Sequence, residues 1–464
     1  MNLFDNNMRR VITAAILGNA LEIYDIVIYG FFASAIARNF FPQEDKITGL
    51  VSSFAIFFIG YLARPLGALF FGRIGDNFGR KPALLASISL MAISTCGIGL
   101  IPDYDTIGGP ILLLLNLRLL QGFSCGGELI GSIIFLVEHA PKNQRGFYAA
   151  LGIMGSGVAF LLASLIAWLI HISFSDAAVV SGVWRLPFLG GALIGWVGWF
   201  MRRRIPETEL FQQTIRMPEY YLRAYSEYAK QLRNGIIIVT LTLFSAVLGY
   251  LIYVFMVTYM TSVLRYTHAQ ALSIIILSTS VLVLLEPLMG KLSDHIGRRS
   301  VMALALIGSV IWIWPYFWLL QQQNILLASL AQLVITLFAS AYIGAKAATI
   351  VEIIPVHLRF TVSAFAYAVA LSLFGGVTPL GATLLIKATH SPYSLALGVT
   401  LCALISAIAV YKVRETSGAP KYIKKGTDED ITQIAHNMLA NGDSVEQVAA
   451  VTGLSKIEVA KIKL

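Results

Sequence analysis

The feature that most constrains this chain is a succession of apolar segments, each about 20 residues long, separated by short polar connections. A helix of that length crosses the hydrocarbon core of a bilayer while pairing all of its own backbone groups. Only 13% of the residues are charged and 57% are hydrophobic, whereas soluble chains carry about 25% charged residues. The sequence therefore predicts an all-α polytopic membrane protein.

The apolar segments divide into two sets of six around a polar stretch. We expect a six-helix bundle over 1–202, a central loop over 203–235, a second six-helix bundle over 236–413 and a soluble helical tail over 414–464. The twelve expected spans are 12–37, 49–71, 82–101, 110–137, 147–171, 184–201, 236–262, 269–290, 300–320, 325–351, 361–386 and 393–412.

Basic residues gather in the connections on one side of these spans, which explains the net charge of +9 better than a nucleic-acid surface does. By the positive-inside rule, that side and both termini are cytoplasmic. The tail contains "QVAAVTGLSKIEV", which has the look of a helix-turn-helix. Its seven basic and seven acidic residues leave no basic footprint for DNA, so we expect a docking or stabilising appendage.

Two motifs occur once in each half of the chain. "GRIGDNFGRK" at 72–81 recurs as "GKLSDHIGRR" at 290–299, and "EHAPKNQR" at 138–145 recurs as "EIIPVHLR" at 352–359. The offsets of 218 and 214 residues agree on one duplicated six-span unit. Two parallel repeats predict a pseudo-two-fold axis along the membrane normal, with a cavity between the halves.

The repeated loops also place opposite charges at the same membrane depth. Their arginines can reach carboxylates at the ends of other spans, and such clusters can latch a gate that breaks when the halves rock. The alternative for any single residue is a topogenic cation with a solvated partner. The candidate gate residues are Gly72, Asp76, Arg80, Lys81, Glu138, Arg145, Asp294, Arg298, Arg299, Glu352 and Arg359.

Together, the loops, the duplication and the spans resemble the major facilitator superfamily. Further segments resemble its metabolite:proton symporter family, which carries proline and betaine, 2-oxoglutarate, citrate or shikimate. These segments include "GNALEIYDIVIYGFFA", "LARPLGALFFGRIGDNFGRKP", "RLLQGFSCGGELIGSIIFLVEHAPKNQRGFY" and "EPLMGKLSDHIGRR". The resemblance covers about residues 10–415 and implies a bacterial inner-membrane transporter that works by alternating access.

Charged residues in the first and fourth spans are the candidates for proton coupling. Glu22, Asp25 and Tyr29 follow i, i+3, i+7 spacing and share one helix face. Intramembrane ionisable groups normally face a cavity or a partner. The resemblance implies that Asp25 exchanges the proton and pairs with Arg118. A static ion pair is the alternative, and Glu22 could bind substrate, assist the proton or hold Arg64.

Several other residues in the spans are candidates for substrate binding. Arg64 suits a substrate carboxylate, or it could fix a neighbouring helix through backbone carbonyls. Lys346 could bind an anion, pair structurally with Glu286, or snorkel. Tyr250 and Tyr253 offer cavity walls or aromatic packing. The full candidate set is Arg64, Tyr29, Gln121, Tyr250, Tyr253, Lys346 and Glu286.

The basic set of Arg64, Arg118 and Lys346 favours an anionic cargo. We therefore expect a proton symporter that imports a small organic carboxylate, functions as a monomer in the lipid bilayer, and uses neither a metal nor a cofactor besides the coupling proton. The alternative is a proton symporter for a zwitterionic osmolyte such as proline or glycine betaine, and a transporter-like sensor is a third possibility. No catalytic triad, metal motif or phosphate loop is apparent, so an enzyme is not expected.

Overall fold

The computed structural model describes residues 6–41, 46–77, 80–104, 111–203, 230–355 and 358–417, with single positions at 439, 445 and 462. This described part is helical and contains no strand, which confirms the all-α expectation. Residues Met1–Gly418 form one compact unit and Ala419–Leu464 another. The central loop from 204 to 229 and nearly all of the tail lie outside the described residues.

The helices of the first half (described residues 6–203) follow the six expected spans. They are α1 (Asn6–Phe31) with α2 (Ala33–Phe40), α3 (Lys46–Leu62) with α4 (Arg64–Asn77), α5 (Arg80–Leu100), α7 (Ile111–Ser124) with α8 (Glu128–His139), α9 (Arg145–Ser173), the short α10 (Asp176–Ser181), and α11 (Leu186–Arg203).

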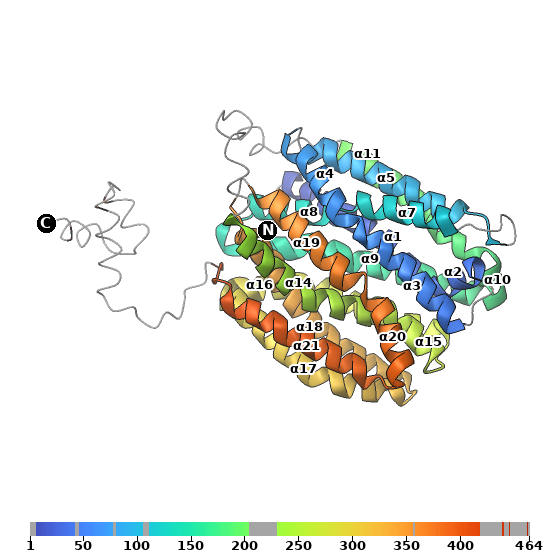
Figure 1. Ribbon diagram of the computed structural model, residues 1–464. Coiled ribbons are helices and arrows are strands. Elements are labelled where there is room, and N and C mark those ends of the chain that lie inside the picture. The colour runs from blue at the N-terminus through green and yellow to red at the C-terminus, as the bar shows by residue number, and fades with distance from the viewer. Residues whose placement is uncertain are drawn as a thin grey trace. The chain divides into compact units, whose positions relative to one another are not determined.

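In the second half (described residues 230–417), the helices repeat this plan. They are α14 (Leu232–Gly249), the π-helical η4 (Tyr250–Phe255) and α15 (Met256–Ser262), then α16 (His268–Ile296), α17 (Arg298–Gln321), α18 (Ile325–Glu352), α19 (Arg359–Ala370) with the π-helical η6 (Leu371–Gly375) and α20 (Thr378–Thr389), and α21 (Tyr393–Lys412). In Figure 1 the helices of the two halves form two groups that lie side by side.

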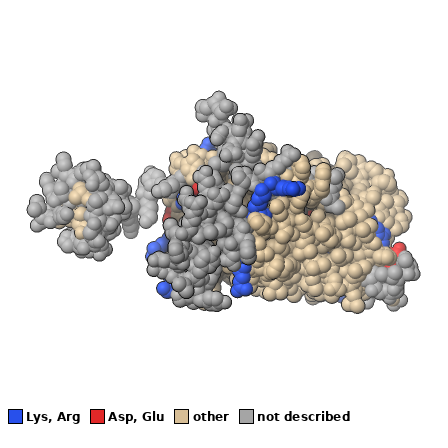
Figure 2. Space-filling view, turned by 90° about the horizontal axis from the view of Figure 1, so that it is seen from above, with Lys and Arg blue, Asp and Glu red and all other residues tan. Residues whose placement is uncertain are grey.

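Ten helical stretches in the described residues are long and apolar enough to cross a membrane, or eleven if α1 and α2, bent by 62°, count as one span. The sixth expected span, 184–201, coincides with α11 but does not reach that threshold. Large apolar side chains are widely exposed, among them Leu112 at 71% and Leu326 at 75%. Figure 2 shows a broad uncharged stretch of surface, as expected where lipid replaces water.

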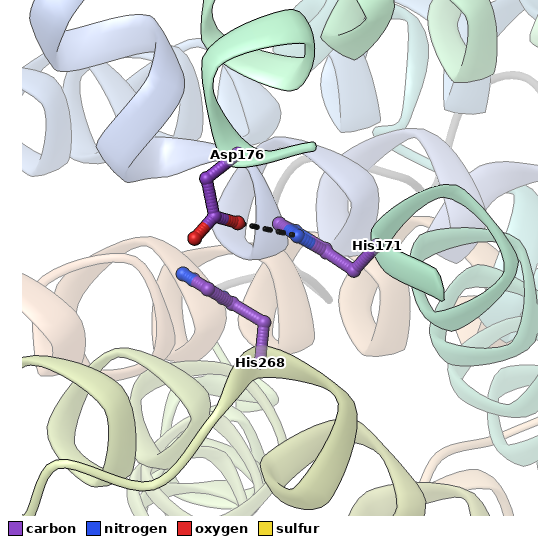
Figure 3. A group of neighbouring side chains, drawn as sticks. All are labelled: His171, Asp176 and His268. Atoms are coloured by element: carbon purple, nitrogen blue, oxygen red, sulfur yellow. Dashed lines mark ion pairs between the residues drawn. The ribbon is translucent and has the colours of Figure 1, made fainter. Parts of the chain in front are cut away.

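The two halves meet along a seam between α9 of the first and α16 of the second. Gly146 and Gly290 lie so close that a Cβ atom on Gly290 would come within 2.5 Å of the Gly146 carbonyl oxygen. Midway along, Gly157 faces the Glu286 carboxylate, and at the far end the rings of His171 and His268 stack (Figure 3). The absence of side chains at the glycines allows this close approach.

Irregular helical segments lie in the middle of both halves. The chain breaks between α7 and α8 at "CGG", where a Cβ on Gly126 would meet the Ala68 nitrogen at 2.0 Å. In the second half, η4 and η6 widen the helix by π-turns, which are frequent at functional sites. Discontinuous helices of this kind are the usual frame of midplane binding sites in transporters.

Candidate functional site

Glu22 and Arg64 form a buried ion pair in the first half. Their exposed fractions are 1% and 3%, so neither charge is solvated by water. The start of α8 also contributes, because the Leu129 N–H donates to Glu22 Oε2 at 3.1 Å. A helix N-terminus carries partial positive charge and stabilises an anion. Of the expected roles of Glu22, holding Arg64 is the one this geometry displays directly.

Arg64 is held by the α7–α8 break as well as by the acid. Its Nη2 lies 3.4 Å from the carbonyl oxygen of Cys125, so both expected kinds of partner, a carboxylate and a backbone carbonyl, are present. Its Nη1 donates no hydrogen bond within the described residues. A small cavity between the halves lies against this guanidinium and is also lined by Glu22, Tyr367 and Leu371. The guanidinium therefore keeps a donor for a ligand.

Asp25 and Arg118 are joined through two intervening side chains rather than by a direct ion pair in the described residues. The Thr95 hydroxyl donates to Asp25 Oδ2 at 2.6 Å, and Gln121 Nε2 donates to that hydroxyl at 2.7 Å. Arg118 in turn donates to Gln121 Oε1. This relay from α1 through α5 to α7 differs from the direct pairing that we expected, and the coupling role of the two residues stays a prediction.

Aromatic rings surround Arg118 and reach across to the second half. The Arg118 guanidinium carbon lies 4.3 Å from the ring centre of Tyr29, whose hydroxyl donates to the Ser53 carbonyl at 3.2 Å. The hydroxyls of Tyr61 and Tyr250 hydrogen-bond to each other between the halves, with ring centres 5.6 Å apart. Tyr250 therefore belongs to the central site.

Tyr253 occupies a different environment from Tyr250. Its hydroxyl donates to Thr336 Oγ1 at 3.0 Å, and its ring packs 5.4 Å from Phe160 of α9. Residues three apart share a face of a regular α-helix, but the π-turns of η4 change the angular spacing. Of the two tyrosines, Tyr250 is the one whose ring contacts Tyr61 beside Arg64. Packing between helices is thus the better account of Tyr253.

The second half contributes two buried charges that are not paired with each other in the described residues. Lys346 Nζ donates to Ser245 Oγ at 2.6 Å and lies 5.3 Å from the Tyr367 ring centre. Glu286 Oε2 accepts no hydrogen bond within the described part of the chain and faces Gly157 across the seam. Both side chains are at least 98% buried, so neither snorkels to water. Tyr367, the ring beside Lys346, lines the cavity.

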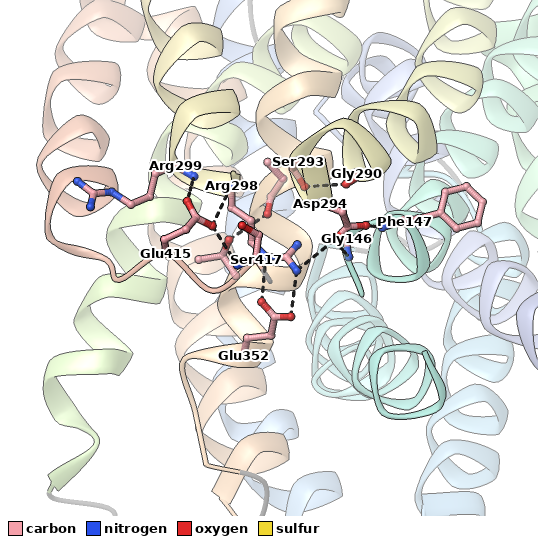
Figure 4. A network of polar contacts seen from close by, with 12 residues as sticks. Gly146, Phe147, Gly290, Ser293, Asp294, Arg298, Arg299, Glu352, Glu415 and Ser417 are labelled. Carbon is pink, nitrogen blue, oxygen red and sulfur yellow. Dashed lines mark hydrogen bonds and ion pairs between the residues drawn. The ribbon is translucent and has the colours of Figure 1, made fainter. Parts of the chain in front are cut away.

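A polar network closes one end of the bundle, which we call the gate end (Figure 4). Asp294 crosses between the halves, accepting hydrogen bonds from the N–H groups of Gly146 at 2.8 Å and Phe147 at 3.0 Å at the start of α9. Arg298 bonds to Asp294 at 3.4 Å and to Glu352 at 3.0 Å. Separating the halves at this end requires breaking the contacts of Asp294 with Gly146 and Phe147, whereas the Arg298 contacts lie within the second half.

The other expected gate residues are distributed around this network. Arg359 pairs with Glu138 of the first half at 3.4 Å. Arg299 does not reach Glu352 and instead donates to the carbonyls of Val410 at 3.1 Å and Tyr411 at 2.9 Å. Arg145 begins α9, Gly72 is buried near Phe360, and Lys81 lies in the first turn of α5. The side chains of Asp76 and Arg80 lie outside the described residues.

Several site residues carry no distinctive sequence signal. Thr95 and Ser245 are small polar residues in apolar runs, where hydroxyls usually bond their own helix. Tyr61, Tyr367 and Glu415 are equally inconspicuous. Glu415 lies just after α21 and accepts hydrogen bonds from the N–H groups of Arg298 and Arg299, each at 3.0 Å. The sequence did not predict this contact, because Glu415 is far along the chain from the loop at 290–299.

Comparison with known proteins identifies the family. The model of the Major Facilitator Superfamily matches residues 15–379 and 238–442, and residues 429–464 match the C-terminal HTH domain of the Rpn/YhgA-like nuclease family. The proline/betaine transporter of Escherichia coli K12 is 33% identical over 455 residues, covering 96% of this chain and 91% of the relative. The citrate-proton symporter of Salmonella typhi is 35% identical over 410 residues, covering 86% and 93%.

A solved structure supports the fold. The proton:xylose symporter XylE superposes with a TM-score of 0.71 at 16% identity, covering 89% of this chain and 97% of that one. The helix-turn-helix look of the tail agrees with its separate family match. The chain therefore belongs to the major facilitator superfamily, within its metabolite:proton symporters, as a multi-pass membrane protein that transports a small molecule and is not an enzyme.

Proposed function

We propose that this chain is a proton-coupled symporter for a zwitterionic compatible solute of the proline and glycine betaine class. The observation that carries the proposal is the charge balance of the central site. The described interior around the cavity contains three buried acids, Glu22, Asp25 and Glu286, and three buried bases, Arg64, Arg118 and Lys346. A zwitterion adds no net charge to such a site, whereas a di- or tricarboxylate would leave several uncompensated negative charges in low dielectric.

The ion pair of the first half weakens the expectation of an anionic cargo. That expectation counted three inward-facing bases, but Glu22 already neutralises Arg64. The Nη1 donor of Arg64 can still orient one carboxylate group, which proline and betaine both have.

Aromatic rings next to Arg64 suit the cationic end of a zwitterion. Tyr61, Tyr250 and Tyr367 offer ring faces or edges near the cavity, and a quaternary ammonium is attracted to such faces. The names of the proline/betaine relatives support this class.

A second candidate is proton symport of an organic carboxylate. The relative named citrate-proton symporter, at 35% identity, favours it. So does Lys346, whose described hydrogen bond goes to a neutral hydroxyl rather than to an acid. If Lys346 neutralised a second carboxylate of the cargo, the charge balance would have to be met by protonating Glu286.

For the mechanism, we infer that Asp25 takes up and releases the coupling proton. When ionised, Asp25 accepts a hydrogen bond from the Thr95 hydroxyl, which is connected to Arg118 through Gln121. Protonation removes the charge that orders this relay, which would let α1, α5 and α7 move relative to one another. Opening at the gate end then requires release of Asp294 from Gly146 and Phe147.

We further propose the cellular setting. The gate end with its basic loops and both termini would face the cytoplasm of a bacterial inner membrane. The chain would work as a monomer without metal or organic cofactor for transport, and the proton would be the coupling ion. The tail would dock or stabilise rather than bind nucleic acid, because its charges balance.

Uptake into proteoliposomes tests the proposal. Purified protein is reconstituted and given labelled glycine betaine, proline or citrate with an inward proton gradient. We expect accumulation of glycine betaine or proline, loss of accumulation when a protonophore collapses the gradient, and no uptake of citrate. Gradient-driven uptake of citrate without uptake of either zwitterion would overturn the substrate class in favour of the second candidate.

A further inference from the structure

A cluster of two histidines and an aspartate lies at the end of the seam opposite the gate end (Figure 3). His171 is in the last turn of α9, Asp176 is the first residue of α10, and His268 is the first residue of α16. One possible ligand atom from each lies within 4.8 Å of the other two. His171 Nδ1 is 3.6 Å from Asp176 Oδ1. The transport site described above uses none of these residues.

We propose that His171, Asp176 and His268 bind a divalent transition metal ion of the Zn²⁺ class and that the ion links the two halves. Two imidazoles and one carboxylate are a donor set that Zn²⁺ accepts, with a water completing a tetrahedron. His171 and Asp176 belong to the first half and His268 to the second. A bound ion therefore holds α9 and α16 together at this end.

The two imidazoles lie in contact across the seam. Their ring centres are 4.2 Å apart with planes inclined by 3°, and the Phe32 ring is also stacked with His171, with ring centres 5.9 Å apart. The His171 side chain is only 7% exposed, and Asp176, 80% exposed, keeps the cluster accessible to ions from solution.

Coordination requires a small local adjustment. Metal–nitrogen bonds of about 2.1 Å in a tetrahedron place ligand atoms about 3.4 Å apart. The possible ligand atoms now lie within 4.8 Å of one another, and the two rings are stacked. Because imidazole lone pairs lie in the ring plane, the rings have to turn about their side-chain torsions to point at one ion, and the exposed Asp176 has to move inward. Both changes involve side chains at helix ends and leave the helices of the seam in place.

Because binding this ion needs both halves in contact at this end, it selects the conformation that is closed there. Zn²⁺ is then expected to inhibit any transport cycle that must separate α9 from α16 at His171 and His268. By linkage, the ion also stabilises the folded chain, since a ligand that binds the native state raises its free energy of unfolding.

Isothermal titration of the purified full-length chain with Zn²⁺ tests the site without reference to any substrate. We expect one Zn²⁺ per chain. His171→Gln and His268→Gln should each weaken binding more than tenfold, because even indirect supports of a metal ligand change affinity about 10–100-fold. His390→Gln is the matched control, since His390 is an exposed histidine outside the cluster. Wild-type affinity in His268→Gln, or no saturable site in the wild type, would overturn the proposal.

Two further measurements cover the case in which a histidine variant folds poorly. Asp176→Asn alters an exposed side chain and should weaken Zn²⁺ binding while leaving the thermal midpoint without metal unchanged. Zn²⁺ should raise the thermal midpoint of the wild type and of His390→Gln but not of His268→Gln. Equal Zn²⁺ stabilisation of all three proteins would contradict the assignment.

The inhibitory consequence rests on the proposed transport function and has its own readout. In proteoliposomes, Zn²⁺ should slow uptake by the wild type and leave His268→Gln unaffected. If saturating Zn²⁺ binds but does not slow uptake, the ion does not hold the two halves together. The metal site itself would not be contradicted by that result. An absence of uptake for every substrate tried would instead refute the proposed function, and the titration would still decide the metal site.

Discussion

In the first half, each buried acid of α1 accepts a hydrogen bond from an identified donor, whereas Oε2 of Glu286, the buried acid in the middle of α16, accepts none in the described residues. Glu22 has Arg64 and the Leu129 N–H, and Asp25 has Thr95. Glu286 Oε2 has no hydrogen-bond partner in the described residues. The duplicated loops at the gate end resemble each other in sequence, yet the buried centres differ. The loops at the gate end are therefore similar in the two halves, whereas the buried charged residues of the two halves differ.

This difference indicates that the buried charged residues of the two halves have different roles. A buried acid whose ionised form accepts a hydrogen bond, as Asp25 does from Thr95, can be changed by the uptake of one proton, which suits coupling. A buried lysine and glutamate with spare hydrogen-bonding capacity can instead accept groups of an incoming ligand, because unpaired buried charge is costly until it is matched. The comparison therefore predicts that matched substitutions in the two halves have different consequences.

The largest effect is expected for Asp25→Asn. The amide keeps the size and the Thr95 contact but cannot exchange a proton. We expect proton-driven accumulation to fall more than tenfold in proteoliposomes while counterflow exchange of the same substrate persists. Wild-type concentrative uptake by the variant would show that coupling lies elsewhere, and Glu286 in the second half would be the next candidate.

Glu22→Gln should have the largest effect on stability. It leaves the Arg64 charge buried without its ion-pair partner, and breaking a buried pair costs about 3–5 kcal/mol. We expect a thermal midpoint several degrees below that of the wild type. The double variant Glu22→Gln/Arg64→Gln should recover part of the loss, because it removes both charges. No recovery in the double variant would argue against the ion pair as the cause.

Glu286→Gln is the matched substitution in the second half. Since Glu286 has no ion pair in the described residues, the amide should lower the thermal midpoint less than half as far as Glu22→Gln does. Substrate affinity should weaken instead, and thermal-shift titration with glycine betaine measures this. A stability loss equal to that of Glu22→Gln would erase the contrast between the halves.

The smallest effect is expected at Glu415, which caps the start of α17. Burial raises the pKa of this carboxyl, but the backbone N–H groups of Ser417, Arg298 and Arg299 outweigh it and hold the pKa below its usual value. A carboxyl with a lowered pKa stabilises the fold above its unfolded pKa of about 4.3, and this contribution is lost as the pH falls through its folded pKa.

Glu415→Gln should therefore destabilise the protein by about 1 kcal/mol at neutral pH, as loss of a helix cap does. The difference from the wild type should shrink below about pH 4, where both side chains are uncharged. Midpoints measured from neutral to acidic pH check this. A difference that does not change with pH would show that the charge of Glu415 is unimportant.

Much of the gate was predictable from the sequence, and much of the centre was not. The repeated motif placed Arg298 and Glu352 at one membrane depth, and the structure joins them. The contact between Glu22 and Arg64 was also predictable, because one of the alternatives for Glu22 was to hold Arg64. The link from Asp25 to Arg118 through Thr95 and Gln121 was not predictable, since it depends on α5 packing between α1 and α7.

The sequence by itself determined the fold class, the family and the duplicated plan, because these follow from the length of apolar runs and from local motifs. Tertiary structure decided which charges touch, since hydrogen bonds extend only about 3 Å and small rotations of a helix change their partners. It also brought His171, Asp176 and His268 together across the seam. Their separations along the chain carry no regular spacing, and only the packing of α9 on α16 makes them neighbours.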